Sequence, residues 1–268
     1  MPELLEAEAA RACLEERALD RKIAAVEAPD AWYLKRGLTA PAIQDALAGR
    51  RLATARRTGK QLLLDTTAVG RSRTPGPVLG LHLGMSGRVV VDGESAGDPL
   101  LYASNAENPA WLRFGLRFAD GGSLWLRDPR RLGAVELDPD EARFGPDATR
   151  LDRRGLDRAL ATSRAPLKAV LMDQSRIAGL GNLLTDEVLW RSGLDPARPA
   201  GALDKRERAA LLRAIRQTVR TLGRRGGSHT GDLQASRLRG GVCPRDGAEL
   251  LRRTVGGRTT YSCPVHQL

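Results

Sequence analysis

The stretch Leu112-Arg113-Phe114-Gly115-Leu116-Arg117-Phe118 alternates strictly between apolar residues and arginine or glycine. Side chains along a β-strand point alternately to the two faces of a sheet, so this pattern predicts a strand with one buried face. Shorter runs of the same kind lie at residues 61–65, 78–83, 88–91 and 123–126, and turn-rich segments separate them. The period of two extends from residue 22 to about 137 and favours an antiparallel sandwich or barrel.

Helical patterns lie on both sides of this β-rich half. Residues 3–18 place Leu5, Ala9, Ala12 and Cys13 on one helical face. Four more helices are predicted at residues 153–161, 166–172, 183–191 and 205–223. The strand-like pieces 249–255 and 258–261 are joined by Gly256-Gly257, which predicts a hairpin. The chain is therefore expected to be α+β, with segments 1–138, 139–225 and 226–268.

The charge balance indicates a polyanionic partner without proving one. Lysine and arginine number 43 against 32 acidic residues, which gives a net charge of +11 and a pI of about 10.5. Proteins that hold nucleic acids have this balance, but so does an arginine-rich protein with a well-solvated surface. No apolar run approaches the roughly 20 residues of a membrane span, and no secretory signal is visible. We therefore expect a cytoplasmic protein without a membrane partner.

Two short motifs near the C-terminal end predict a metal site. Cys243-Pro244-Arg245-Asp246 and Cys263-Pro264-Val265-His266 each place two candidate ligands three positions apart, one motif at each end of the hairpin. Zinc accepts thiolate, imidazole and carboxylate ligands in a tetrahedral site, although this mixed set should bind it less tightly than four cysteines. The alternative is a hairpin that has lost its metal, with Asp246 serving only as a turn residue.

The first residues offer a nucleophile. Removal of Met1 would leave Pro2 with a secondary amine beside the carboxylates of Glu3 and Glu6. An amine can attack an aldehyde or a sugar anomeric carbon, and a secondary amine then gives a cationic iminium. The alternative is that Pro2 merely precedes a helix whose first turn contains acidic residues.

Two further segments could bind phosphate. In Ala178-Gly179-Leu180-Gly181-Asn182-Leu183 a glycine-rich turn opens a helix, which predicts a phosphate site with Asn182 as N-cap, as phosphate ligand, or as both. Arg258 follows the hairpin turn and could grip a phosphate with its guanidinium. Each segment also has an ordinary interpretation, a helix cap for the first and a solvated side chain for the second.

Taken together and in this order, these residues resemble the formamidopyrimidine-DNA glycosylase and endonuclease VIII family of base-excision repair enzymes. No single motif decides the resemblance, which covers nearly the whole chain. The matching segments are Pro2-Glu3-Leu4 with Glu6, residues 59–64, 82–87, 128–131 and 168–174, Gly179 to Glu187, and residues 255–258.

The resemblance implies a fold and a chemistry. The fold would be an N-terminal helix on a two-layer antiparallel β-sandwich (1–138), a helix-two-turn-helix domain (139–225), and a linker with a zinc-finger-like hairpin (226–268). The catalytic set would be Pro2, Glu3, Glu6, Lys60 and Arg258. Pro2 would attack the sugar of a flipped-out damaged nucleotide while Glu3 handles protons at the ring, giving glycosylase and abasic-site lyase activity by β,δ-elimination.

The resemblance also assigns contacts with double-stranded DNA that contains a damaged base or an abasic site, bound by a monomer. Lys60, His82, Asn182 and Arg258 would hold phosphates around the lesion, and Lys168 is a weaker candidate of the same kind. Met85, Arg130 and Leu132 would fill the space left by the flipped base. One zinc ion per chain would be held by Cys243, Asp246, Cys263 and His266.

Two departures concern the substrate rather than the chemistry. Leu132 stands where the formamidopyrimidine branch usually has an aromatic wedge, and residues 226–241 are short and contain no aromatic side chain. The first departure leaves discrimination of the opposite base open, and the second lowers the expectation of a specialist for 8-oxoguanine. Two other interpretations stay open at this point: a non-catalytic binder of damaged DNA on the same scaffold, and a zinc-hairpin RNA-binding protein.

Overall fold

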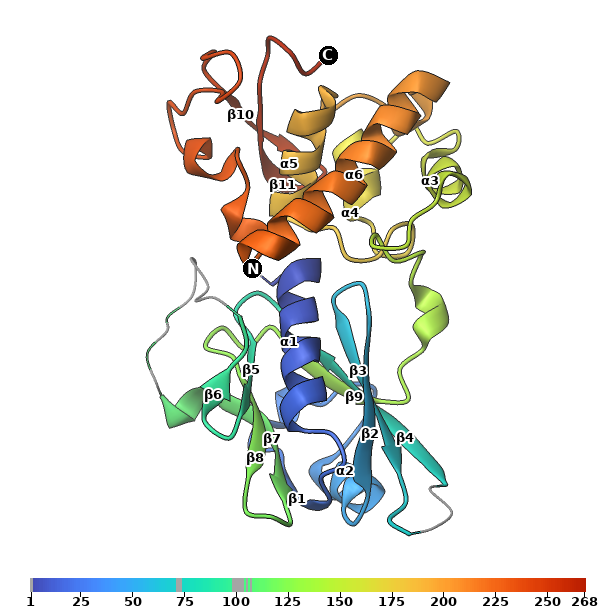
Figure 1. Cartoon of the computed structure of the whole chain (residues 1–268), viewed down its shortest axis with the longest axis vertical. Coiled ribbons are helices and arrows are strands. Elements are labelled where there is room, and N and C mark those ends of the chain that lie inside the picture. The colour runs from blue at the N-terminus through green and yellow to red at the C-terminus, as the bar shows by residue number, and fades with distance from the viewer. Residues whose placement is uncertain (1, 71–73, 98–103, 105, 107) are drawn as a thin grey trace. The chain divides into compact units, whose positions relative to one another are not determined.

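The computed structural model describes residues 2–70, 74–97, 104, 106 and 108–268. It contains two compact units (Figure 1). Unit 1 comprises Met1–Pro2 and Glu6–Glu141, and unit 2 comprises Glu3–Leu5 and Ala142–Leu268. The first helix, α1 (Leu4–Arg17), thus has its first two residues in unit 2. The hairpin also belongs to unit 2, and the expected boundary between residues 225 and 226 remains a prediction.

Unit 1 is built from two antiparallel sheets. One has the strand order β1-β7-β8-β5-β6 and the other has the order β2-β3-β4-β9. The strands of the first sheet are β1 (Ile23–Glu27), β5 (Arg88–Val91), β6 (Glu94–Ser95), β7 (Leu112–Phe118) and β8 (Ser123–Arg127). Those of the second are β2 (Arg51–Thr58), β3 (Gln61–Thr67), β4 (Pro75–His82) and β9 (Ala134–Leu137). The core takes side chains from both sheets, which confirms the sandwich.

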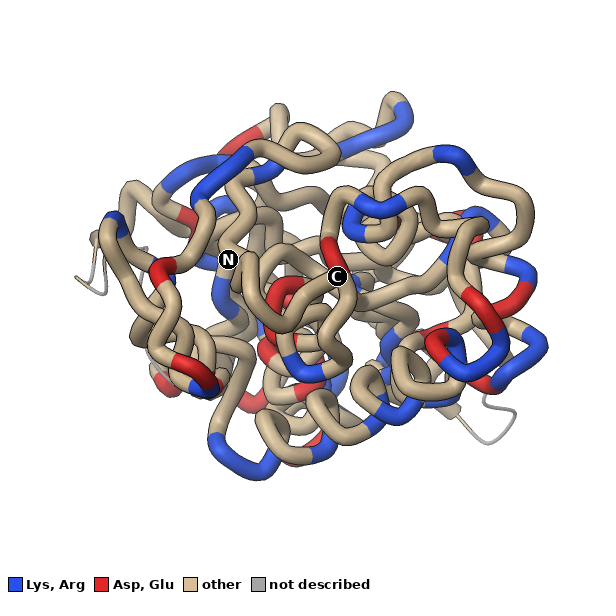
Figure 2. The backbone as a smooth tube through the Cα atoms, turned by 90° about the horizontal axis from the view of Figure 1, so that it is seen from above, with Lys and Arg blue, Asp and Glu red and all other residues tan. Residues whose placement is uncertain are grey.

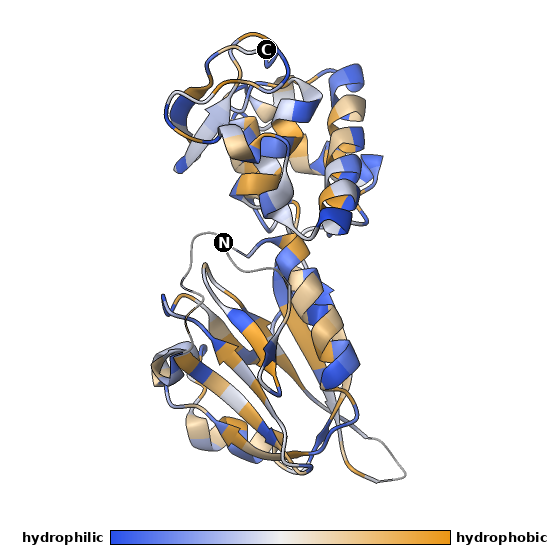
Figure 3. Ribbon diagram, turned by 60° about the vertical axis from the view of Figure 1, so that its left-hand side comes forward, coloured by the Kyte–Doolittle hydropathy of each residue, from blue (hydrophilic) through white to orange (hydrophobic). Residues whose placement is uncertain are grey.

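The alternating stretch forms β7, as predicted. Phe114 and Leu116 are fully buried in the core between the sheets, while Arg113 and Arg117 point away from it. Leu112 departs from the pattern because the pairing of β7 with β8 shifts register between Leu112 and Phe114. That side chain lines a surface pocket instead. The strands of unit 1 show hydrophobic residues along both sheets (Figure 3).

One helix lies where the sequence predicted only strands. Helix α2 (Ala40–Leu47) is capped by Thr39, whose hydroxyl accepts a hydrogen bond from the N–H of Ala42. Its buried residues, Ile43 and Leu47, are four positions apart, as one helical face requires. Strands β1, β2, β6 and β9 were also not predicted, and β2 illustrates why. Its sequence, RLATARRT, has too few apolar residues to show the alternation clearly.

The helices of unit 2 agree with the predicted ones to within two residues at each end. They are α3 (Arg153–Leu160), α4 (Leu167–Met172), α5 (Asn182–Ser192) and α6 (Lys205–Arg225). Helix α6 begins with a capping box formed by Asp204 and Glu207, and it ends at Gly226 in the left-handed conformation. Both features are strong helix-boundary signals, so the ends of α6 are defined by local sequence.

The predicted hairpin consists of β10 (Leu251–Val255) and β11 (Arg258–Ser262). Gly256 and Gly257 have φ values of +58° and +72°, the positive angles that a two-residue hairpin turn requires. A small cluster of buried side chains packs around it: Trp190, Leu233, Cys243, Leu250, Tyr261 and Cys263. In the described part of the chain, no helix has the length and apolar character needed to cross a membrane.

Candidate functional site

The carboxylate of Glu3 occupies the N-terminus of α5. Its Oε1 accepts a hydrogen bond from the N–H of Leu183 (2.8 Å), and its Oε2 accepts from the N–H groups of Gly181 (3.0 Å) and Leu184 (3.1 Å). The side chain of Glu3 is fully buried. An ionised carboxylate is the acceptor that three unpaired N–H groups at the positive end of a helix favour. Glu3 therefore fills the position expected for a phosphate in this turn.

This arrangement corrects the interpretation of the glycine-rich turn. Gly181, not Asn182, is the N-cap of α5, and it has no side chain to cap the helix. Asn182 is the first helical residue and is half-buried. Its amide oxygen accepts no hydrogen bond from the described residues. The prediction of Asn182 as N-cap is wrong, and its role as a phosphate ligand stays a prediction.

Pro2 directly precedes this anchored carboxylate. Leu4 is fully buried in the core of unit 2, and its N–H donates to the carbonyl of Gly179 (3.2 Å). The residues that follow Pro2 are thus held in place by backbone, side-chain and core contacts. Glu6 lies in the first turn of α1 and is half-buried. Met1 lies outside the described residues, so its removal stays a prediction.

Lys60 and His82 lie close together in unit 1. Lys60 is in the turn between β2 and β3, and the next residue, Gln61, pairs with His82 across β3 and β4. The N–H of Gly84 donates to Nδ1 of His82 (3.1 Å). Because Nδ1 accepts in this bond, the neutral form of the ring has its proton on Nε2.

Met85, Arg130 and Leu132 lie on two loops that pack against each other. A Cβ on Gly84 would lie 2.4 to 2.5 Å from the backbone of Leu132, so the loops meet there without space for a side chain. Met85 and Leu132 are exposed, at 37% and 49%. The structure thus brings these predicted wedge residues into one region of unit 1.

Asp128 organises this region, a role that was not predicted from the sequence. Its fully buried carboxylate accepts hydrogen bonds from side chains of other segments and from backbone N–H groups of its own loop. The side-chain donors are the hydroxyls of Tyr33 (3.0 Å) and Ser86. The backbone donors are Arg130 (3.1 Å), Leu132 (2.8 Å) and Gly133 (2.9 Å). Asp128 therefore sets the shape of the loop that presents Arg130 and Leu132.

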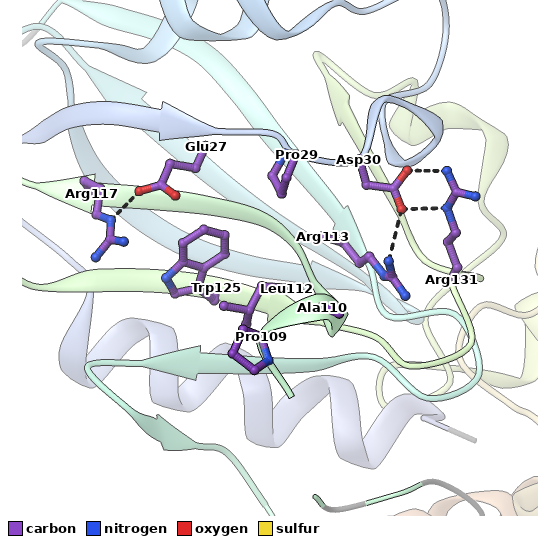
Figure 4. A pocket seen from close by; sticks show the side chains of 10 residues that line it. All are labelled: Glu27, Pro29, Asp30, Pro109, Ala110, Leu112, Arg113, Arg117, Trp125 and Arg131. Atoms are coloured by element: carbon purple, nitrogen blue, oxygen red, sulfur yellow. Dashed lines mark hydrogen bonds and ion pairs between the residues drawn. The ribbon is translucent and has the colours of Figure 1, made fainter. Parts of the chain in front are cut away.

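The remaining arginine of this loop turns to a pocket on the first sheet (Figure 4). Arg131 donates to both carboxylate oxygens of Asp30, each at 2.6 Å, and Arg113 approaches the same carboxylate at 3.5 Å. The hydrogen bonds from Arg131 hold the pKa of Asp30 below its ordinary value. The pair occupies the guanidinium of Arg131, whereas the exposed neighbours Arg130 and Leu132 do not contact Asp30 through their side chains.

Lys168 is not placed to contact a phosphate. Its side chain is fully buried, and Nζ forms an ion pair with Asp186 (2.6 Å) and donates to the hydroxyl of Thr260 (2.8 Å) and the carbonyl of Thr259 (3.1 Å). Burial lowers the pKa of Lys168, and the carboxylate of Asp186 opposes that effect. An ammonium group has three donors, and all three have partners here. The prediction of a phosphate contact by Lys168 is wrong.

Arg258 is exposed at the tip of the hairpin, as predicted. A Cβ on Gly256 would lie 2.8 Å from Cβ of Ala169, so the hairpin turn rests directly on α4. Lys168 holds the adjacent β11 through its bonds to Thr259 and Thr260. The buried lysine thus positions the strand that carries Arg258.

Two buried acids of α5, Asp186 and Glu187, lie in a segment that matched the family, but their structural role was not predicted. Asp186 forms ion pairs with Lys168 and with the guanidinium of Arg237, and it accepts a hydrogen bond from the N–H of Tyr261 (3.2 Å). Glu187 accepts from the N–H of Leu233 (3.0 Å) and, like Asp186, is almost fully buried. These carboxylates connect α5 to the hairpin and to the segment that precedes it.

The predicted metal ligands converge. One ligand atom from each of Cys243, Asp246, Cys263 and His266 can be chosen so that all lie within 4.8 Å of one another. Nδ1 of His266 faces Oδ2 of Asp246 (2.6 Å), while Nε2 lies 3.2 Å from the carbonyl oxygen of Trp190. A carbonyl that accepts from the second ring nitrogen orients an imidazole that ligates a metal through the first.

The sulfur atoms are surrounded by donors suited to thiolates. Cys243 Sγ lies 3.4 Å from the N–H of Arg245 and 3.3 Å from the indole N–H of Trp190. Cys263 Sγ lies 3.4 Å from the N–H of Val265. Both cysteines are buried. The donor set therefore fits a metal ion with tetrahedral coordination.

Comparison with known proteins identifies the family. Residues 1–135 match the formamidopyrimidine-DNA glycosylase N-terminal domain, and residues 144–232 match the H2TH domain of the same enzymes. The formamidopyrimidine-DNA glycosylase of Paracoccus denitrificans is 34% identical over 298 residues and covers both chains completely. That of Corynebacterium aurimucosum is 33% identical over 288 residues, which cover 100% of this chain and 96% of the relative.

Solved structures give the same result. A complex of Lactococcus lactis Fpg (MutM) with DNA containing an oxidised pyrimidine has a TM-score of 0.82 and 27% identity, with 99% of each chain covered. Complexes of the same protein with DNA containing an abasic site or FAPY-dG have TM-scores of 0.81 and 0.80. The chain therefore belongs to the formamidopyrimidine-DNA glycosylase family, the DNA glycosylases of base-excision repair.

Proposed function

We propose that this chain is a bifunctional enzyme that removes oxidised bases from DNA and then cleaves the strand as an abasic-site lyase. The observation that carries the proposal is the carboxylate of Glu3, held by three N–H groups directly after Pro2. A nucleophile must be held in near-attack geometry to react efficiently. The anchored Glu3 supplies that constraint for the amine of Pro2 once Met1 is removed.

The proposed reaction begins at the sugar of the flipped-out nucleotide. The nitrogen of Pro2 forms a bond to C1′ as the bond from C1′ to the base breaks, and the departing base takes up a proton. Glu3 assists proton transfer at the ring oxygen, the ring opens, and a cationic iminium forms between Pro2 and C1′. The iminium acidifies C2′, because electrons released there reach the positive nitrogen.

Two eliminations would follow from that cation. Loss of a proton from C2′ expels the 3′ phosphate, and a further proton loss along the conjugated chain expels the 5′ phosphate. Water finally releases the sugar fragment and regenerates the amine. Lys60, His82, Asn182 and Arg258 would hold the neighbouring phosphates during these steps. Their cationic and N–H donors suit the sharply bent backbone of an extruded nucleotide.

We further propose that Cys243, Asp246, Cys263 and His266 hold one zinc ion per chain. Two thiolates, one imidazole and one carboxylate satisfy the tetrahedral preference of zinc, which would fix the hairpin that carries Arg258. The proposed partner is double-stranded DNA with a damaged base or an abasic site, bound by a monomeric protein in the cytoplasm. The zinc-hairpin RNA-binding alternative has no support in residues 1–135, which match the glycosylase N-terminal domain.

Borohydride trapping on abasic-site DNA tests the lyase proposal. Reduction of the iminium should produce a covalent protein–DNA band from the processed wild type. The band should vanish in Pro2→Gly and in a protein that retains Met1, while both variants still bind the same DNA. A wild type that binds abasic DNA without any trapped product would instead support the non-catalytic binder.

A further inference from the structure

The arginines of unit 2 include ion-paired ones and others that form no ion pair with the described residues. Many are neutralised by carboxylates, as Arg198 is by Glu207 (2.5 Å) and Arg237 is by Asp186. A second group lies along α6: Arg213, Arg216, Arg220 and Arg224, which we call the α6 stripe. All four are exposed, and within the described residues none of them forms an ion pair. Between Arg208 and Gly231 the sequence contains no acidic residue that could neutralise them.

Helical spacing puts the stripe on a single face. The intervals of three, four and four residues keep the side chains above one another. The buried positions Leu211, Ile215 and Leu222 lie on the opposite face, where α6 packs into the core of unit 2. At 1.5 Å per residue, the eleven steps from Arg213 to Arg224 span about 16 Å. The stripe is thus a linear array of cations turned away from the core.

A hollow widens the middle of this array. A pocket of about 380 Å³ lies between residues 148–151 and α6, and its charged lining consists of Arg150, Arg216 and Arg220. The guanidinium of Arg216 donates to the carbonyl of Leu151 (2.9 and 3.3 Å), which fixes it beside the hollow. Arg150 and Arg220 have no ion-pair partner among the described residues.

The carboxylates near the hollow already have partners. Asp147 accepts from the N–H and hydroxyl of Thr149, and Asp152 accepts from the N–H of Gly155 at the start of α3. Asp157 pairs with Arg208 (3.3 Å). None of these three acids lines the hollow. The local field at the hollow is therefore set by its guanidinium groups.

The stripe is separate from the hairpin that presents Arg258. Helix α5 contacts both α6 and β11, and in Figure 1 it lies between them. Basic residues occur along much of the backbone (Figure 2), but those of the stripe combine exposure, linear spacing and absence of ion pairs. The proposed chemistry at Pro2 does not use them.

We propose that the α6 stripe, together with Arg150, binds the phosphate backbone of a second segment of DNA, apart from the duplex at the candidate active site. Duplex DNA carries about one negative charge per 1.7 Å of its axis, so an array of this length faces several phosphates. Guanidinium groups match phosphate geometry, and the hollow has no aromatic residue for base stacking. Binding at the stripe is therefore independent of sequence and of damage.

The test removes the three stripe arginines that make no structural hydrogen bond. The variant Arg213→Gln/Arg220→Gln/Arg224→Gln keeps α6 in good helix-forming residues and leaves Arg216 in place. The matched control is the corresponding triple lysine variant, which keeps the charge. Binding of each full-length protein to a long undamaged duplex is measured by fluorescence anisotropy over a range of salt concentrations.

The wild type and the lysine control should share one salt dependence. In the glutamine variant, the slope of log K against log salt concentration should fall by about two to three, since each phosphate contact contributes roughly 0.9. Energy transfer between two differently labelled duplexes should appear with the wild type and disappear with the glutamine variant. Borohydride trapping on a short abasic duplex should stay unchanged in all three proteins.

Three results would overturn the proposal. An unchanged slope would show that the stripe binds no phosphates. A smaller slope without energy transfer from the wild type would mean that the stripe contacts the same duplex as the candidate active site. A parallel loss of trapping would place it within the catalytic interface. Failure of Pro2 to trap would leave the salt slope untouched, so the two proposals fail separately.

Discussion

The carboxylate of Glu3 and the backbone of Gly181 are so close that no side chain fits between them. A Cβ on Gly181 would lie 2.2 Å from Cδ and 2.5 Å from Oε1 of Glu3. The φ of Gly181 is −119°, which any residue can adopt. Position 181 therefore requires glycine for lack of space and not for backbone conformation. This close contact joins the N-terminal residues of the chain to the start of α5.

This relationship predicts the effect of Gly181→Ala. The methyl group must displace the carboxylate of Glu3 from its three N–H donors. We expect the free energy of unfolding to fall by about 1–3 kcal/mol, the range for overpacking a closed site. The fraction of protein trapped on abasic DNA should fall further than stability alone explains, because Pro2 loses its fixed neighbour.

Gly223→Ala is the matched control. Its added Cβ would lie 3.5 Å from Leu5, an ordinary contact, and the residue is inside α6. Helix propensity favours alanine there by about 1 kcal/mol. Chemical denaturation and trapping are measured on both variants. Full trapping by Gly181→Ala would show that the position of Glu3 does not matter for the amine.

The contact between Tyr33 and Asp128 leads us to expect a loss of stability at high pH. Burial and the adjacent carboxylate of Asp128 raise the pKa of Tyr33 well above its ordinary value of 10.0. The folded state therefore keeps the phenol neutral while the unfolded chain ionises near that ordinary value. The stabilisation is fully present below about pH 10 and is lost as the pH rises further.

Tyr33→Phe isolates this contribution. It removes the hydroxyl donor and leaves four others on Asp128, so we expect a loss of about 1 kcal/mol at neutral pH. Above about pH 10 the variant should lose stability less steeply than the wild type. The measurement is denaturant unfolding at several alkaline pH values, and parallel curves for the two proteins would contradict the assignment.

Lys168→Met separates a structural lysine from a phosphate-binding one. Its removal leaves the buried Asp186 with only Arg237 and the N–H of Tyr261, so the free energy of unfolding should fall by about 3–5 kcal/mol. Backbone amides of β11 should exchange faster, because Lys168 bonds Thr259 and Thr260. Lys205→Met, an exposed lysine at the start of α6, should change stability by less than about 0.5 kcal/mol.

The two roles give opposite patterns for Lys168→Met. If Lys168→Met is as stable as Lys205→Met but binds DNA more weakly, the result would support the phosphate contact that was predicted from the sequence. A destabilised variant whose DNA binding recovers when the fold is stabilised by salt-independent means, such as an osmolyte, supports the buried ion pair.

Local periodicity explains why much of the fold was predictable. The alternation of β7, the helical spacing of α3 to α6 and the glycine pair of the hairpin are all signals within one segment. Strand β2 has too few apolar residues to show a clear alternation. Helix α2 lies within a segment whose overall period of two predicted only strands. The ligand set of the metal site was also visible, because each motif of two ligands is short and the hairpin brings the motifs together.

The rest of the site depends on contacts between distant segments. Asp128 accepts hydrogen bonds from residues 33 and 86 as well as from its own loop. No pattern in the neighbouring sequence indicates that its carboxylate is buried. Lys168 matched a family motif, yet lysines are rarely buried, so the motif alone favoured an exposed phosphate ligand. The N–H groups at the start of α5 were expected to bind a phosphate, because their actual acceptor, Glu3, lies 178 residues before Gly181.

The metal site yields the last prediction, which concerns Asp246→Cys. The wild-type set has one hard carboxylate beside two soft thiolates and an imidazole, and zinc favours the softer donors. Asp246 is also exposed, and its hydrogen bond with His266 holds the pKa of its carboxyl group well below the ordinary value. We expect one zinc per chain in both proteins by metal analysis, and slower loss of zinc to a chelator in the variant.

Asp246→Asn, which keeps the size but removes the charge, should lose zinc faster than the wild type. If all three proteins contain no zinc and keep the same thermal stability with and without chelator, the four side chains form only a hydrogen-bonded cluster that closes the hairpin.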